Sequence, residues 1–240
     1  MGACRVVVGA CRVVVGACRV VVGACRVVAP PRPGRRYRGH VRVIAGSSRG
    51  RRLPARLPGG VRPTADRVRE AIFDILGSMG GVEGARVVDL YCGSGALGVE
   101  ALSRGAAAAT FVDHDAAALQ AVRTNLAATG LASRPSTLVR AELPGWLGRA
   151  PAFDLALCDP PYDFGDWPVL LGTLPAEVAV LESPVEVAVP GDWVIARSRR
   201  YGGTLVTVVR TGSHHQSARP DASHHQSAHP DVSGRRTAVT

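Results

Sequence analysis

The sequence predicts an α/β protein with a mainly parallel, Rossmann-like sheet of seven strands that ends in an antiparallel hairpin. Over residues 41–212, short apolar runs rich in β-branched residues alternate with segments of helical spacing. This alternation is typical of parallel strands joined by right-handed crossovers. The run that ends at Leu90 is followed by a glycine turn that opens a helix, which is how such a sheet builds a nucleotide pocket.

Composition divides the chain into three parts. Residues 1–40 hold a Gly-Ala-Cys-Arg-Val-Val-Val repeat followed by a Pro-rich linker, and we expect them to be disordered and to lie outside the fold. Residues 213–240 repeat Ser-His-His-Gln-Ser-Ala. We expect a disordered polar tail there, although its histidines leave metal binding open. The remaining residues, 41–212, form the predicted folded domain, which a small amino-terminal β-hairpin opens.

Charge is distributed unevenly along the chain. All 29 basic residues are arginine and the net charge is +10, with 16 arginines but only 2 acidic residues in 1–70. A basic arm on a mildly acidic body favours an enzyme that binds a polyanion. Four of the six cysteines belong to the repeat, and no pair has metal-ligand spacing, so we predict no metal site and a reducing, cytoplasmic environment. No apolar run approaches the ~20 residues of a membrane span.

The elements follow in order. Residues 41–46 alternate as a short strand, and a second strand is expected to return through Leu57. Thr64 is a suitable N-cap for a helix from about Ala65 to Leu76, in which Arg69 is expected to point away from the core. The later strands are expected at 87–90, 109–113, 138–140, 153–158, 178–182, 193–197 and 204–209, with helices at 96–102 and 116–128.

The glycine turn indicates a nucleotide-like ligand without choosing which one. Gly93, Gly95 and Gly98 satisfy the dinucleotide fingerprint, and Asp113 lies 18 residues past Gly95. Adenosyl cofactors of several kinds use such a turn. A nicotinamide-dependent dehydrogenase therefore stays open, as does a turn that joins strand to helix without binding anything.

The stretch Asp159-Pro160-Pro161-Tyr162 is a more specific signal. Two prolines after a buried strand fix an extended, rigid corner, which offers the Pro160 carbonyl beside the Asp159 carboxylate. Tyr162 presents a flat ring on which a base can stack. Two acceptors and a stacking face suit a planar substrate with an exocyclic amine, whose nitrogen lone pair is freed when both N–H bonds are held. An electrophilic sulfonium methyl group in line with that nitrogen fits this arrangement.

Four motifs together resemble the RsmD-type methyltransferases. They are Arg42-Val-Ile-Ala-Gly-x-x-Arg-Gly-Arg-x-Leu53, Arg62-Pro-Thr-x-Asp-Arg-Val-Arg-Glu-x-x-Phe73, Gly93-Ser-Gly-Ala-Leu-Gly-x-Glu-Ala-Leu-Ser-Arg104 and Asp159-Pro-Pro-Tyr162. The match covers about residues 41–210. It implies a class I methyltransferase that uses S-adenosylmethionine to methylate guanine N2 of 16S ribosomal RNA, on free RNA or on the assembling small subunit. We expect a monomer.

The resemblance also implies roles for individual residues. The expected cofactor residues are Asp89, Tyr91, Gly93, Ser94, Gly95, Asp113 (ribose hydroxyls) and Glu142 (near the adenine, where the family usually has aspartate). The expected catalytic residues, which would hold the flipped guanine, are Asp159, Pro160, Pro161 and Tyr162. The expected RNA-binding residues are Arg49, Arg51, Arg52, Arg62 and Arg67.

Two alternatives remain at this point. A DNA or other RNA amino-methyltransferase would use similar acceptors for its target amine, although no sizeable domain is present to recognise duplex sequence. A non-catalytic RNA-binding relic of the same fold is motivated by segment 163–176, which is short for the family's crossover helix and contains Pro168, Gly172 and Pro175. A distorted turn there would loosen the wall behind Tyr162.

Overall fold

The computed structural model of the protein describes residues 41–55 and 66–212. The predictions for the repeat, the linker and the tail lie outside these residues, as do those for Leu57, Thr64 and Arg62. The chain divides into two units, Met1–Arg38 and Gly39–Thr240, and the fold below is that of the second.

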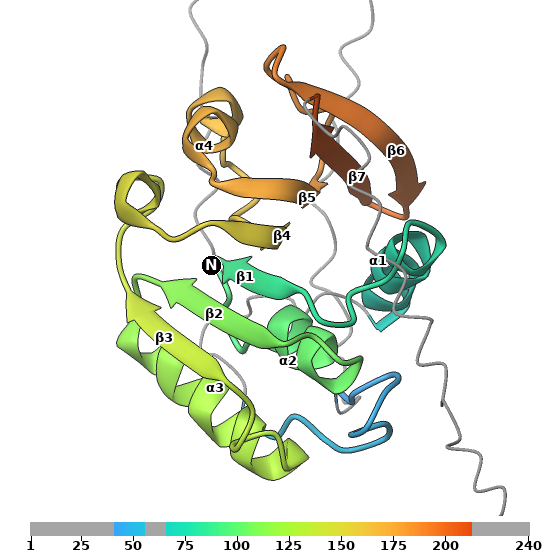
Figure 1. The fold of residues 1–240 in the computed structure, drawn as a ribbon, viewed down its shortest axis with the longest axis vertical. Helices are drawn as coiled ribbons and strands as arrows, with labels where there is room; N and C mark the ends of the chain where they lie inside the picture. The colour runs from blue at the N-terminus through green and yellow to red at the C-terminus, as the bar shows by residue number, and fades with distance from the viewer. Residues whose placement is uncertain (1–40, 56–65, 213–240) are drawn as a thin grey trace, which may run out of the picture. The chain divides into compact units, whose positions relative to one another are not determined.

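A seven-stranded sheet forms the centre of this unit, in the order β3-β2-β1-β4-β5-β7-β6 (Figure 1). The five strands from β3 to β5 pair in parallel, whereas β7 is antiparallel to both β5 and β6. The predicted fold class is therefore confirmed. The strands are β1 Arg86–Leu90, β2 Ala108–Asp113, β3 Ser136–Arg140, β4 Phe153–Cys158, β5 Ala176–Ser183, β6 Trp193–Tyr201 and β7 Thr204–Thr211.

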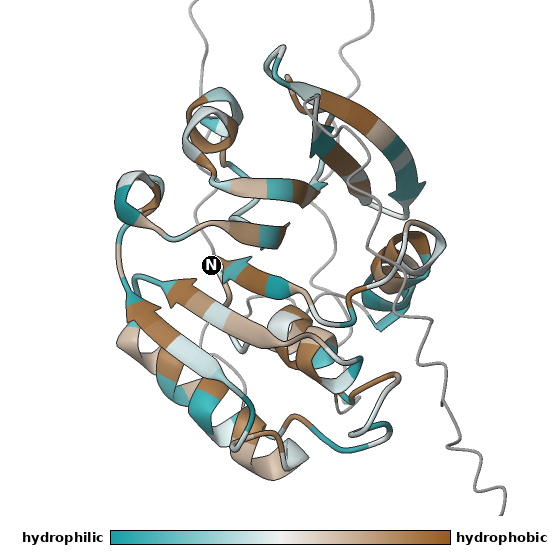
Figure 2. Ribbon diagram, in the orientation of Figure 1, coloured by the Kyte–Doolittle hydropathy of each residue, from teal (hydrophilic) through white to brown (hydrophobic). Residues whose placement is uncertain are grey.

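Helices cover both faces of the sheet. They are α1 Asp66–Ser78, α2 Ala96–Ser103, α3 Ala116–Thr129, the short η1 Leu147–Arg149 and α4 Trp167–Thr173. Apolar residues of α1, α2 and α3 pack with one face, and those of η1 and α4 pack with the other. Figure 1 shows α2 and α3 against the β1–β3 half and α4 beside β5, and in Figure 2 hydrophobic residues recur along the strands. Within residues 41–55 and 66–212, no helix is long and apolar enough to cross a membrane.

The described part of the amino-terminal hairpin closes within residues 41–53. It contains one antiparallel bridge, Arg42↔Arg52, and its returning arm lies at 51–53, because Leu53 N–H donates to the Val41 carbonyl (2.9 Å). Its turn abuts the end of α2. The ideal Cβ position of Gly46 lies only 1.9 Å from the Ser103 carbonyl oxygen, so the close approach requires glycine there.

A buried ion pair corrects the prediction for α1. Arg69 was expected to point away from the core but is fully buried, as is Glu100 on α2. The Nε atom of Arg69 lies 3.7 Å from Oε2 of Glu100. Glu100 also accepts hydrogen bonds from Ile44 N–H (2.7 Å), Ala45 N–H (3.0 Å) and Arg104 Nε (2.7 Å). One carboxylate therefore joins the hairpin, α1 and α2. Arg69 Nη2 also donates to the Arg42 carbonyl (2.5 Å) and to Asp66 Oδ1 (3.0 Å). Together these partners make the burial of both charges tolerable.

The shortened crossover is a true helix rather than a distorted turn. Pro168 stands in the first turn of α4, where a missing N–H costs nothing. Trp167, Leu170 and Leu171 are buried, and Trp193 Nε1 donates to the Leu171 carbonyl (3.0 Å). The expected loosening of this layer is therefore not observed.

We predict that Arg69→Leu lowers the free energy of unfolding by about 3 kcal/mol, since it leaves part of a buried carboxylate's charge uncompensated. Arg67→Leu is the matched control, because Arg67 is exposed in the same helical turn, and it should change stability by less than about 0.5 kcal/mol. Urea unfolding of both variants measures the difference. Equal losses would show that the buried pair does not hold the hairpin.

Candidate active site

The candidate site is set by the position of β1 between β2 and β4. Leu90, the last residue of β1, pairs with Val112 on one side and with Cys158 on the other. The residues that follow these partners are Asp113 and Asp159. The glycine turn after β1 therefore leaves the sheet between two carboxylates, at the edge where α/β proteins bind their ligands.

The glycines of this turn are required by their backbone and by their neighbours. Gly93 and Gly95 have φ values of 53° and 75°, a region that glycine enters without steric cost. At Gly98, in the first turn of α2, a Cβ atom would lie 2.3 Å from Cε1 of Phe111 and 3.1 Å from Oδ2 of Asp89. The absence of side chains lets α2 approach the sheet closely.

Asp89 is a buried carboxylate at the base of the turn. Its Oδ2 accepts a hydrogen bond from Gly98 N–H (2.9 Å). Burial raises the pKa of Asp89 well above its usual range, the Gly98 N–H opposes that rise, and the negative charges of Asp159 and Asp113 add to it. Carboxylates at the ends of three neighbouring strands thus act on one another, and such a cluster favours a cationic ligand.

Asp113 is held by backbone donors on both of its oxygens. Oδ2 accepts from Gly93 N–H (3.0 Å) and Oδ1 from Asp115 N–H (2.9 Å). Asp115 in turn caps α3 by accepting from Ala117 N–H (2.8 Å). These bonds fix the carboxylate beside the glycine turn and leave each oxygen a further lone pair for a ligand hydroxyl.

Tyr91 begins the turn in a strained conformation. Its φ is 56°, which costs a non-glycine residue about 1–2 kcal/mol. Its ring lies 5.5 Å from that of Phe164, and Phe164 meets Trp167 edge-on at 5.0 Å. The Tyr91 hydroxyl is buried without a hydrogen-bond partner among the described residues, and burial raises its pKa. Backbone strain at such a position is common where a ligand is held.

The diproline corner follows β4 directly. Pro160 is buried, while Pro161 and Tyr162 are exposed. Tyr162 is 56% exposed, so its ring is available for stacking. Its hydroxyl lies 3.5 Å from the Thr204 hydroxyl, at the start of β7. The corner therefore connects the end of β4 with the hairpin formed by β6 and β7.

Of the other predicted residues, Glu142 follows the carboxyl end of β3 at this same edge, whereas Arg49, Arg51 and Arg52 lie elsewhere. Glu142 is exposed in the loop after β3. The turn that carries the exposed Arg49, Arg51 and Arg52 packs against the C-terminal ends of α2 and α3, because Ser47 and Ser48 bond the carbonyls of residues 103 and 129. The glycine turn is at the opposite end of α2. Arg67 is exposed in the first turn of α1.

Sequence reasoning missed Asn125, a fully buried residue of α3. Its Nδ2 donates to the Ser94 carbonyl (2.9 Å), and its Oδ1 accepts from Ala55 N–H (3.0 Å). It thus ties the glycine turn to the end of the amino-terminal hairpin. A lone amide between Val122 and Leu126 on an apolar helix face is the signal that could have revealed it.

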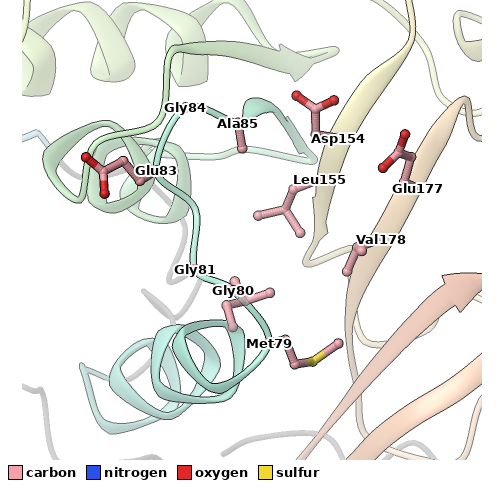
Figure 3. Close-up of a pocket in the computed structure, with 11 residues that line it drawn as sticks. Met79, Gly80, Gly81, Glu83, Gly84, Ala85, Asp154, Leu155, Glu177 and Val178 are labelled. Atoms are coloured by element: carbon pink, nitrogen blue, oxygen red, sulfur yellow. The ribbon is translucent and has the colours of Figure 1, made fainter. Parts of the chain in front are cut away.

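A hollow of about 400 Å³ lies at the other edge of the sheet. Figure 3 shows Asp154 and Glu177, the second residues of β4 and β5, above it, with Met79 and the Gly80-Gly81 link on the side of α1. Arg86 pairs with Asp154 there (3.0 Å), which lowers the pKa of that carboxyl. Because it lies at the amino ends of the strands, this hollow is separate from the candidate site.

Comparisons with known proteins agree with this geometry. The family described as conserved hypothetical protein 95 matches residues 41–210. Ribosomal RNA small subunit methyltransferase D of Escherichia coli is 35% identical over 175 residues, covering 68% of this chain and 86% of the relative. The chain belongs to the RsmD family of methyltransferases.

Further similarities extend over most of the RsmD-family domain. The putative rRNA methyltransferase YlbH of Bacillus subtilis is 37% identical over 184 residues, covering 71% of this chain and 98% of the relative. The solved structure of the putative methyltransferase yhhF from Escherichia coli has a TM-score of 0.63 and 34% identity, and covers 72% of this chain and 98% of that one. The predicted family is therefore confirmed.

We predict opposite effects for two helical glycines. Gly98→Ala should destabilise the protein by about 1–3 kcal/mol, because the new methyl group overlaps Phe111, and should weaken binding of S-adenosylhomocysteine. Gly77→Ala is the control, since no atom lies within 4 Å of its Cβ position, and should stabilise α1 by up to about 1 kcal/mol. Thermal unfolding and calorimetry measure both effects. Tight ligand binding by the Gly98 variant would contradict the close packing described above.

The raised pKa of Asp89 predicts a pH dependence. Folding favours the neutral carboxyl, so its contribution to stability is full below the unfolded pKa of about 4 and is lost as the pH rises through the folded pKa. Asp89→Asn removes this titration. The unfolding free energy of the wild type, relative to that of the variant, should therefore fall as the pH rises above about 4 in urea titrations. A difference that stays constant as the pH rises above about 4 would exclude a raised pKa.

Proposed function

We propose that this chain transfers the methyl group of S-adenosylmethionine to the exocyclic N2 amine of a guanine in small-subunit (16S) ribosomal RNA. The observation that carries the proposal is the adjacency of two corners, the glycine turn after β1 and the Asp159-Pro160-Pro161-Tyr162 corner after β4. The names of the bacterial relatives support the RNA substrate.

The residues around the glycine turn suit S-adenosylmethionine. The cofactor carries a cationic sulfonium, an ammonium group and a ribose diol, and it supplies an electrophilic methyl group. Asp89, Tyr91, Gly93, Ser94 and Gly95 would line its amino-acid and ribose end. The cluster of carboxylates favours its positive charges, and Asp113 has lone pairs free for the diol. Glu142, exposed after β3, would reach toward the adenine.

The diproline corner would hold the target base. Asp159 and the Pro160 carbonyl would accept the two N–H bonds of the amine, while Pro161 keeps the corner rigid. The exposed Tyr162 ring would stack on a guanine flipped out of its helix. Holding both hydrogens localises the nitrogen lone pair, and the Asp159 carboxylate stabilises the positive charge that develops on the amine. This route requires no metal ion and no covalent intermediate.

The arginines of the amino-terminal part would bind RNA phosphates. Arg49, Arg51 and Arg52 project from the hairpin turn, Arg67 from the start of α1, and Arg62 lies between them in the sequence. The hairpin turn is at the far end of α2. These contacts would therefore bind phosphates at a distance from the reacting base and so orient the RNA. The proposed partner is 16S rRNA or the assembling small subunit, bound by a monomer in the cytoplasm.

We predict that Asp159→Ala lowers the rate of methyl transfer at least about 100-fold, because an acceptor and a transition-state charge are lost. Binding of S-adenosylhomocysteine should remain nearly intact. Asp163→Ala, an exposed position four residues further on, is the control and should leave the rate unchanged. Labelled-methyl transfer to naked 16S rRNA, assembled small subunits and duplex DNA measures the rates.

The substrate arms of this experiment also separate the alternatives. Methylation of duplex DNA alone would replace the RNA substrate with DNA. Binding of S-adenosylhomocysteine without transfer to any substrate would indicate a non-catalytic relic. Unchanged turnover in Asp159→Ala would remove this residue from the mechanism.

A further inference from the structure

The edge hairpin of the sheet carries arginines that the proposed site does not use. Residues 193–212, which form β6 and β7, contain four of the ten arginines of residues 71–212 and no acidic residue. All four are exposed: Arg197, Arg199, Arg200 and Arg210. This segment is therefore strongly basic within an otherwise mildly acidic body.

A β-bulge determines which way two of these arginines point. The register shifts between Ile195 and Arg197, so that Arg197 pairs with Val208 and Arg199 with Val206. Both valines belong to the core on the α1 face of the sheet, and paired residues point to the same face. With an unshifted register the two arginines would point to the opposite face. Bulges that redirect side chains are frequent beside functional sites.

The turn of this hairpin lies at the edge of the candidate site. Leu205, near the start of β7, pairs with Ser183 at the carboxyl end of β5. Thr204 precedes it and lies 3.5 Å from the hydroxyl of Tyr162. Thr204 pairs with Tyr201 across the turn. Arg197, Arg199 and Tyr201, which we call the basic stripe, thus run along one face of β6 toward the diproline corner.

Contacts within the basic stripe prepare it to bind an anion. The guanidinium carbon of Arg199 lies 5.6 Å from the centre of the Tyr201 ring, and Tyr201 packs partly against the core. A guanidinium stacked on a fixed ring loses little freedom when it binds a phosphate. Arg197 and Arg199 are two residues apart, or about 7 Å along the strand, close to the separation of neighbouring phosphates in an extended RNA strand.

We propose that the basic stripe binds the phosphates of the RNA strand next to the target guanine as it enters the diproline corner. This inference rests on the proposed function and extends it to a surface at the reacting edge. The predicted arginines of the amino-terminal hairpin would orient the RNA from the other end of α2, whereas the basic stripe would hold the nucleotides adjoining the flipped base. Phosphate contacts of this kind fix position rather than sequence.

The test compares two double variants of equal charge. Arg197→Gln with Arg199→Gln removes the stripe. Arg149→Gln with Arg200→Gln removes two exposed arginines elsewhere, one on η1 and one on the opposite face of β6. The stripe variant should raise the Kd for a 16S rRNA transcript at least about tenfold and reduce the slope of log affinity against log salt by about 2. The control should change both much less, and S-adenosylhomocysteine should bind both variants as it binds the wild type.

Each outcome addresses either the surface or the proposed function. If the wild type methylates RNA but the stripe variant keeps its affinity and salt slope, the inference is overturned. Equal weakening in both double variants would also overturn it, because net charge alone would then explain the loss. If the wild type methylates no RNA but the stripe variant still loses affinity and slope, the surface is supported while the proposed function fails.

Discussion

The pairing of β1 with β2 on one side and β4 on the other is the constraint on which the site depends. Since all three strands are parallel, their last residues meet at one edge, and the side chains that follow them must share it. Asp89, Asp113 and Asp159 come together for this reason, although they are far apart in the sequence. No flexible loop has to bring them there, which is how a rigid scaffold positions reactive groups.

A second constraint joins this edge to the amino-terminal hairpin. Glu100 receives two backbone N–H groups of the hairpin and the guanidinium groups of Arg69 and Arg104. It belongs to the same short helix as Gly98, which bonds Asp89. One eight-residue helix, α2, thus connects two parts of the protein. The hairpin that carries the arginines is attached at one end of this helix, and the base of the glycine turn is attached at the other. Displacing the hairpin would therefore disturb the helix that supports the turn.

Most strands could be predicted from the sequence because each is a short apolar run bounded by turn residues. The glycine turn and the diproline corner were visible for the same local reason. The burial of Arg69 could not be predicted, because hydrophobic periodicity treats arginine as polar. Its partner Glu100 also comes from another helix, α2. The bulge that changes the face to which Arg197 and Arg199 point was not predicted either. Strand register depends on the neighbouring strand, so the sequence of β6 alone does not reveal it.

The contact at Gly46 also limits how such domains can be recombined. Backbone meets backbone there, with no room for even a methyl group, and the hairpin serines bond the carbonyls that end two helices. A hairpin taken from another methyltransferase, in order to change which RNA this protein binds, would pack against α2 only if it kept glycine at this position. It would also have to meet a helix that ends in the same register. Exchange between such enzymes is therefore expected to succeed when hairpin and helix are transplanted as one cassette.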